Sequence, residues 1–184
     1  MYHIKDDKRI KQSAELIGKG VLACLKNKSL DDITVSDIHR YSSVSRTTFY
    51  RLFDTPLDVL QYLCDQTQQQ ALDQLHAVKD KNPEKQLLNL TSAWLTHATL
   101  LKAIVQSNHV EMLRSAMATG IADVAFDEVI RDVSRYHATE YSTAVVSAIM
   151  IGVVEVWVNN GQKETASELL AGVGGIVQVF SDLS

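Results

Sequence analysis

The sequence has little proline and glycine, with two and eight of 184 residues, and few aromatic side chains. Clusters of β-branched residues are also few, and no pair of strands is indicated, so the composition argues against a β architecture. Hydrophobic residues, by contrast, make up 46% of the chain, and most lie in long stretches with helical spacing. A protein with this pattern can bury a full core, and the pattern predicts an all-α fold.

Cysteine is equally scarce, because Cys24 and Cys64 are the two in the chain and both fall within apolar helical stretches. This usage excludes a disulfide framework and fits a reducing compartment. No apolar segment follows the first residues, and the apolar run at 144–158 is interrupted by Glu155 and shorter than a membrane span. We therefore expect a cytoplasmic protein that makes no use of a membrane.

An excess of positive charge is also missing, since the formal net charge is −4. This value argues against a general nucleic-acid coat, yet it conceals an asymmetry along the chain. Residues 1–53 hold ten Lys and Arg against six Asp and Glu, a balance of +4, whereas residues 54–184 hold eight against sixteen, a balance of −8. The N-terminal part is therefore the one suited to a polyanion.

Apolar periodicity and capping residues divide the chain into helices. The first is predicted at 8–26, followed by short helices at 35–41 and 46–52 and a long one that begins at Thr55-Pro56. Asn82-Pro83-Glu84 starts the next helix, which is expected near 84–106, and further helices are expected near 108–118, 122–136, 140–159 and 165–181. We place a domain boundary between residues 54 and 55, giving domains at 1–54 and 55–184.

The two short helices have the dimensions of a helix-turn-helix. Thr34 and Asp37 form a capping-box pattern, Ser42-Ser43 gives a tight turn, and Ser45 is placed to cap the second helix. Val44, Phe49 and Phe53 offer nothing polar and are expected to pack against Ile17 and Ile38. The residues predicted to contact DNA are Thr34, Ser36, Ser45, Arg46, Thr47, Thr48, Tyr50 and Arg51.

The stretch Ile33-Thr34-Val35-Ser36-Asp37-Ile38, with Val44-Ser45-Arg46-Thr47-Thr48-Phe49-Tyr50-Arg51-Leu52-Phe53, closely resembles the N-terminal domain of the tetracycline-repressor (TetR) family. The resemblance covers about residues 8–64. It implies a homodimer that binds a pseudo-palindromic double-stranded operator, usually as a repressor released by a small effector. By the same pattern, Arg46 and Thr47 would face bases, and Thr48 and Tyr50 the DNA backbone.

Two positions depart from the family pattern. Ser42-Ser43 replaces an alanine-glycine turn, so Ser43 must take a conformation that suits glycine better. Pro56 stands where the family often has a phosphate-binding lysine, and Lys5, Lys8, Arg9 and Lys11 are candidates to replace that charge.

The C-terminal part is expected to form the dimer. The helix near 140–159 is apolar nearly all round, which requires burial on more than one side, and family members usually dimerise through their last two helices. The alternative is that these helices merely complete a monomer core. The predicted interface residues are Ile149, Val153, Val156, Gly172, Val173, Ile176 and Phe180.

A cavity for a small apolar or aromatic effector is the last prediction, with core packing as its alternative. Its candidate lining residues are Trp94, His97, Met112, Met117, Phe126, Tyr141 and Trp157. His97 and His109 have no metal-ligand spacing, so we expect no metal and no cofactor. No set of residues indicates catalysis, so the competing hypotheses are a regulator and a purely architectural or protein-binding helical module.

Together these patterns predict an all-α protein. Its N-terminal three-helix helix-turn-helix DNA-binding domain would be joined by a long helix to a C-terminal helical domain for dimerisation and ligand binding.

Overall fold

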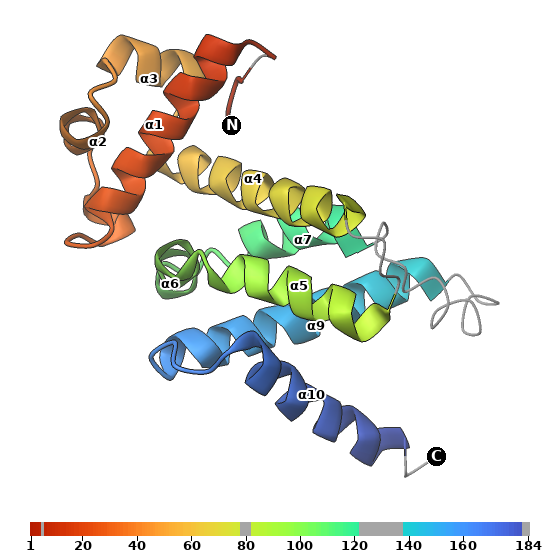
Figure 1. Cartoon of the computed structure of the whole chain (residues 1–184). Helices are drawn as coiled ribbons and strands as arrows, with labels where there is room; N and C mark the ends of the chain where they lie inside the picture. The colour runs from red at the N-terminus through yellow and green to blue at the C-terminus, as the bar shows by residue number, and fades with distance from the viewer. Residues whose placement is uncertain (5, 78–81, 122–137, 182–184) are drawn as a thin grey trace. The chain divides into compact units, whose positions relative to one another are not determined.

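The computed structural model describes residues 1–4, 6–77, 82–121 and 138–181 (Figure 1). Every secondary-structure element in these ranges is helical, apart from one isolated bridge between Tyr2 and Phe53, which confirms the all-α prediction. The helices are α1 (Lys8–Cys24), the short 3-10 helix η1 (Leu30–Asp32), α2 (Val35–Ser42), α3 (Arg46–Leu52), α4 (Pro56–Ala77), α5 (Pro83–Leu95), α6 (Ala98–Gln106), α7 (Glu111–Ile121), α9 (Ala138–Asn159) and α10 (Ala166–Ser181).

One predicted helix boundary was wrong. The single helix expected near 84–106 is broken at Thr96 and His97 into α5 and α6. The Thr96 hydroxyl donates to the Ala93 carbonyl (2.6 Å), and the His97 amide donates to the Trp94 carbonyl (2.9 Å). The Thr96 amide still donates to the Ser92 carbonyl, so the helical ladder is interrupted from His97 on. No glycine or proline is involved, and so the break has no sequence signature. The helix expected near 122–136 lies outside the described residues.

The chain forms two compact units. Met1–Gln66 and Thr99–Ala116 make up the first, and Thr67–Ala98 and Met117–Ser184 make up the second. Helix α4 therefore contributes residues to both. This division follows packing, and the functional boundary expected between residues 54 and 55 stays a prediction.

In the first unit, α1 packs closely on α2. The stripe predicted along α1 is buried, with Ile17 and Val21 fully covered, and Ile38 of α2 is 1% exposed. A Cβ added at Gly20 would lie 2.9 Å from the Ser42 Cβ and 3.1 Å from the Ile38 carbonyl oxygen. The missing side chain at residue 20 therefore sets how closely the two helices approach.

Helix α4 begins as the sequence predicts. Thr55 and Asp58 exchange capping bonds: the Thr55 amide and hydroxyl both donate to an Asp58 carboxylate oxygen at 2.9 Å, and the Asp58 amide donates to the Thr55 hydroxyl. Pro56 occupies the first helical position, where it has no hydrogen bond to lose. Further along, Cys64 is fully buried, and burial raises the pKa of its thiol, which keeps it protonated.

The second unit contains a buried polar contact within its apolar core. Leu72 and Leu75 of α4 are buried, and Leu90 of α5 packs against them. Beside them, the Trp94 indole N–H donates to the Gln68 side-chain oxygen at 2.8 Å, with both residues buried.

Across the described helices, none is both long and apolar enough to cross a membrane.

Gly20→Ala tests the close approach of α1 and α2. Alanine favours the helix by roughly 1 kcal/mol, but the new Cβ would crowd the Ser42 Cβ and the Ile38 carbonyl oxygen, neither of which can move without the backbone. We expect a net loss of about 1–3 kcal/mol in unfolding free energy. Gly18→Ala is the matched control, because its Cβ would meet the Leu63 Cδ2, the mobile end of a side chain. Urea unfolding of both variants checks the order; equal stability of the two would contradict it.

Candidate nucleic-acid interface

The start of α2 is held by a buried carboxylate. The Thr34 hydroxyl accepts from the Asp37 amide (3.2 Å) and donates to Asp37 Oδ2 (2.7 Å), which also accepts from the Thr34 amide (3.1 Å). Lys28 Nζ lies 2.8 Å from the same oxygen. The Lys28 ammonium and the Thr34 donors hold the pKa of Asp37 well below its usual value. The predicted capping box is therefore confirmed, and Lys28 ties the preceding loop to it.

The turn between α2 and α3 is closed by side chains rather than by glycine. Ser43 has a φ of 58°, in the left-handed region, which costs a non-glycine residue roughly 1 kcal/mol. Its amide donates to the His39 carbonyl (2.9 Å), and the Val44 amide donates to the Ser42 hydroxyl (3.1 Å). His39 Nδ1 lies 2.8 Å from the Val44 carbonyl oxygen and must donate, because a carbonyl only accepts. The sequence reasoning missed His39.

Helix α3 separates a buried face from a polar one. Phe49 and Leu52, together with Phe53 at its C-terminal end, are at most 1% exposed. The Ser45 hydroxyl caps the helix by accepting from the Thr48 amide (3.1 Å). The exposed side chains are Arg46, Thr47, Tyr50 and Arg51, with Thr48 half-buried. The predicted division into scaffold and polar face is therefore present, although Val44 is half-buried rather than fully covered.

Arg46 is held from the neighbouring helix. One of its terminal nitrogens donates to the Ser36 hydroxyl at 2.7 Å, so the side chain of α3 is anchored on α2. An arginine fork has five donors, and this contact uses one of them. Ser36 and Thr34 were predicted to contact DNA themselves. In this structure the Ser36 hydroxyl accepts from Arg46, and the Thr34 hydroxyl serves the cap. Their contacts with DNA stay predictions.

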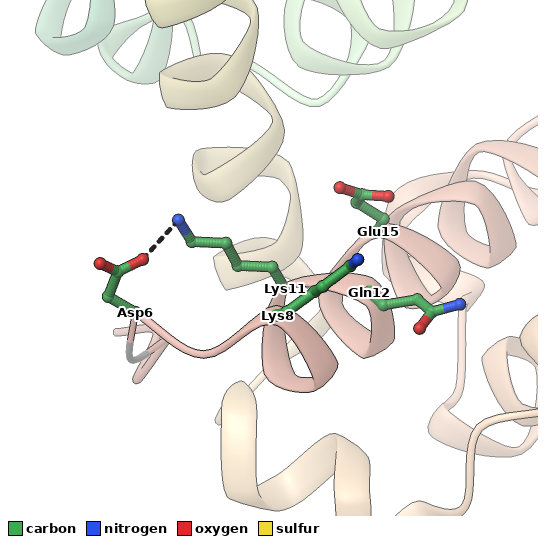
Figure 2. Close-up of a pocket in the computed structure, with 5 residues that line it drawn as sticks. All are labelled: Asp6, Lys8, Lys11, Gln12 and Glu15. Carbon is green, nitrogen blue, oxygen red and sulfur yellow. Dashed lines mark ion pairs between the residues drawn. The ribbon is translucent and has the colours of Figure 1, made fainter.

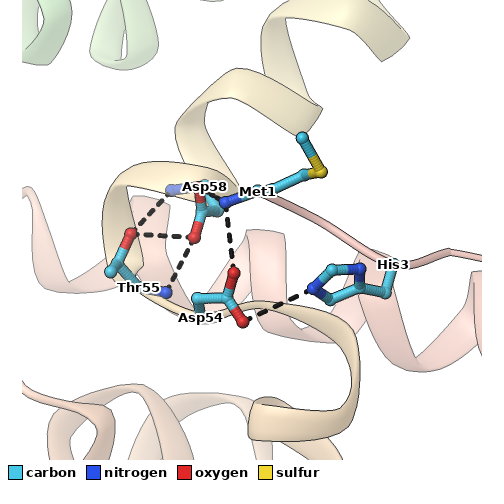
Figure 3. Close-up of polar contacts among 5 residues, drawn as sticks. All are labelled: Met1, His3, Asp54, Thr55 and Asp58. Atoms are coloured by element: carbon cyan, nitrogen blue, oxygen red, sulfur yellow. Dashed lines mark hydrogen bonds and ion pairs between the residues drawn. The ribbon is translucent and has the colours of Figure 1, made fainter.

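Two carboxylates lie where α3 passes into α4, near the position at which the family often has a lysine. Figure 3 shows the Met1 α-amino group between Asp54 and Asp58, with an ion pair to each; the one to Asp54 measures 3.3 Å. His3 Nε2 lies 3.4 Å from the other oxygen of Asp54. The hydrogen bond that the Met1 amino group donates to Asp58 contributes most to raising the pKa of that amino group. These cationic partners offset negative charge beside the polar face of α3.

The cations proposed to replace the missing lysine differ in their surroundings. Lys11 is paired with Asp6 at 2.7 Å (Figure 2), while Lys8 and Arg9 are exposed, and Lys5 lies outside the described residues. Asp6, Lys8, Lys11, Gln12 and Glu15 line a hollow of about 540 Å³ on this part of the surface. Its two cations and two anions balance, so the hollow itself has no preference for an anion.

The predicted effector residues do not share one environment. Trp94, Met117 and Trp157 are buried, and the Trp157 indole N–H donates to the Glu164 carbonyl at 2.9 Å. His97 and Met112 are half-buried, and burial lowers the pKa of His97. Tyr141 is 72% exposed, Met112 belongs to the first compact unit, and Phe126 lies outside the described residues. The cavity therefore stays a prediction.

The predicted dimer residues include exposed apolar side chains. Val156 is 58% exposed and Ile149 38%, whereas Val153 and Val173 are half-buried. A Cβ added at Gly172 would meet nothing within 4 Å, so the glycine leaves open space on this chain. The side chains of Ile176 and Phe180 lie outside the described part.

In the part of the chain that the structure covers, no three His, Cys, Asp or Glu side chains lie close enough together to hold a metal ion.

Comparison with known proteins identifies the fold. No family model and no curated protein matches the sequence. Among solved structures, a protein of Listeria innocua superposes with a TM-score of 0.73 at 12% identity, covering 97% of this chain and 96% of its own. A fatty acid degradation regulator of Bacillus halodurans gives a TM-score of 0.66 at 16% identity, covering 92% and 94%.

A TetR transcriptional regulator of Streptococcus agalactiae gives a TM-score of 0.61 at 18% identity, covering 90% of this chain and 93% of its own. These superpositions extend over both compact units and well beyond the helix-turn-helix. The chain therefore has the all-α fold of TetR-type transcription regulators, as its motif residues predict.

The depressed pKa of Asp37 predicts how stability responds to acid. Because the ionised form is favoured in the folded state, its contribution is complete at neutral pH and is lost as the pH falls below the usual value of 3.8. We expect Asp37→Asn to be less stable than the original protein at pH 7, with a difference that shrinks towards pH 3. Urea midpoints against pH measure this, and Asp31→Asn at an exposed site supplies the background. A constant difference would contradict the assignment.

Proposed function

We propose that the protein is a sequence-specific DNA-binding transcription regulator, acting as a homodimeric repressor on a pseudo-palindromic operator in the cytoplasm. The observation that carries this proposal is α3 itself. Its buried aromatic face anchors the helix, while Arg46, Thr47, Tyr50 and Arg51 stand exposed on the other side. Seven residues in this arrangement suit the width of a major groove.

Arg46 is the residue we assign to base reading, with Thr47 beside it. The Ser36 contact holds the guanidinium in one direction and leaves its remaining donors for the two acceptors on the edge of a guanine. Thr48 and Tyr50 are assigned to the DNA backbone. The Ser45 hydroxyl donates to the Thr48 hydroxyl oxygen at 3.0 Å, so the Thr48 hydrogen is directed elsewhere and suits a phosphate.

Selection from a random duplex library, followed by footprinting upstream of the protein's own gene, tests the proposal. With the selected site, we expect Arg46→Ala to lose roughly 10- to 100-fold in affinity and to tolerate other bases at the position it reads. Tyr50→Phe is the contrasting variant, because losing a phosphate contact weakens binding to all sequences alike. Lys102→Ala, exposed on α6, serves as the charge control. Unsaturable, sequence-blind binding would instead favour the architectural module.

The homodimer is proposed from the exposed side of α9. Ser147, Met150, Ile151, Val154, Trp157 and Val158 are buried on one side of this helix, whereas Val145, Ala148, Ile149 and Val156 are exposed on the other. Positions 145, 149, 152 and 156 follow one another at intervals of three or four residues, and Ala148 lies beside Ile149. With the half-buried Gly152, these residues therefore form one apolar stripe. A second copy of the chain would remove this stripe from water.

Val156→Glu tests the dimer by placing a charge in the stripe. We expect the variant to sediment as a monomer at micromolar concentration, since burying an unpaired carboxylate costs several kcal/mol. Asn89→Glu, an exposed site on α5, should leave the assembly unchanged. Circular dichroism of both variants confirms folding. A monomeric original protein would contradict the proposal.

Release by a small apolar or aromatic effector completes the proposed function. Helix α4 supplies residues to both compact units, which provides a covalent route between an effector in one and operator binding in the other. One structural neighbour is a fatty acid degradation regulator, which is compatible with an apolar signal. If an effector lowers the affinity for the operator by some factor, the operator must lower the affinity for the effector by the same factor. Effector affinities of the free protein and of the operator complex should therefore differ by that factor.

A further inference from the structure

The first four residues, which we call the N-terminal strap (Met1–Ile4), make contacts that the sequence reasoning did not foresee. The Tyr2 ring packs edge-on against Tyr62 of α4, with centroids 5.5 Å apart, and lies 6.4 Å from the ring of Phe53. Its hydroxyl donates to Asp65 of α4 at 2.8 Å. Burial and this bond raise the pKa of Tyr2 to about 12, so the hydroxyl keeps its proton at neutral pH.

The backbone of the strap reaches the end of α3. The His3 amide donates to the Leu52 carbonyl at 2.8 Å, and Tyr2 forms an antiparallel bridge with Phe53. Carbonyls in the last turn of a helix have no partner within the helix, so the strap satisfies one of them. The C-terminal end of α3 and the first turns of α4 are thus joined through residues some fifty positions earlier in the chain.

This connection matters because α3 is seven residues long. Helices of this length are unstable alone, and the direction in which α3 points depends on what holds its two ends. Its N-terminal end is held by the Ser45 cap and by the turn that His39 closes. Its C-terminal end is held by the buried Phe53 and the strap.

We propose that Tyr2 is a positioning residue for DNA recognition, fixing the C-terminal end of α3 on α4 through Phe53, Tyr62 and Asp65. Tyr2 does not touch DNA in this role. The inference rests on the proposed function of α3, and it predicts that the strap controls affinity for the operator without changing the number of cationic side chains available to phosphates.

The test compares Tyr2→Ala and Tyr2→Phe with the original full-length protein on the selected operator and on an unrelated duplex. We expect Tyr2→Ala to lose about tenfold in operator affinity, the scale of one or two aromatic contacts, and Tyr2→Phe about two- to threefold. The salt slope should stay unchanged, because no cationic side chain is removed, and affinity for the unrelated duplex should fall less than affinity for the operator. Amide exchange at Arg51–Phe53 should become faster in both variants.

Val21→Ala is the matched control, since it removes buried volume from the same unit and makes none of the strap contacts. Measured well below its melting temperature, it should bind the operator normally despite lower stability. If Tyr2→Ala behaved like this control, with a lower melting temperature and an unchanged operator affinity, the positioning role would be overturned. If Tyr2→Ala does not fold, Tyr2→Phe decides by the same criteria. An original protein that binds every duplex equally would instead overturn the proposed function and this inference together.

Discussion

The burial of Phe49, Leu52 and Phe53 beneath α3 is the constraint on which the rest of the first unit depends. A seven-residue helix gains too little from its own hydrogen bonds to persist in water. Three large apolar side chains on one side attach it to the core that contains Ile17 and Ile38. That attachment forces the opposite side outward, and the outward side carries the arginines, threonine and tyrosine that a polyanion would meet.

Burial alone leaves a short helix free to tilt, and polar contacts at its margins remove that freedom. The Asp37 carboxylate, with Lys28 and Thr34, fixes the start of α2, and His39 closes the turn in which Ser43 has a left-handed backbone. Ser36 then holds Arg46. Each contact is modest in energy, yet each restricts the orientation of the polar face, as the proposed base recognition would require.

The second unit presents the opposite situation, since apolar surface remains uncovered on α9. Val145 and Val156 are more than half exposed, although the other side of the helix is packed. A stripe of this kind is costly in water unless something covers it. The proposed dimer accounts for it, and also for Gly172, beside which this chain leaves open space.

Local patterns in the sequence were enough to predict the helix at 46–52, the Thr34 and Ser45 caps and the start of α4. They also predicted the division of α3 into a buried and a polar side. All of these depend on residues within a few positions of one another. The break between α5 and α6 was not foreseen, because its hydrogen bonds involve residues that also fit a continuous helix. The anchoring of Arg46 by Ser36 and of Tyr2 by Asp65 was decided by tertiary structure. Their partners are 10 and 63 residues apart, and only folding brings them within bonding distance.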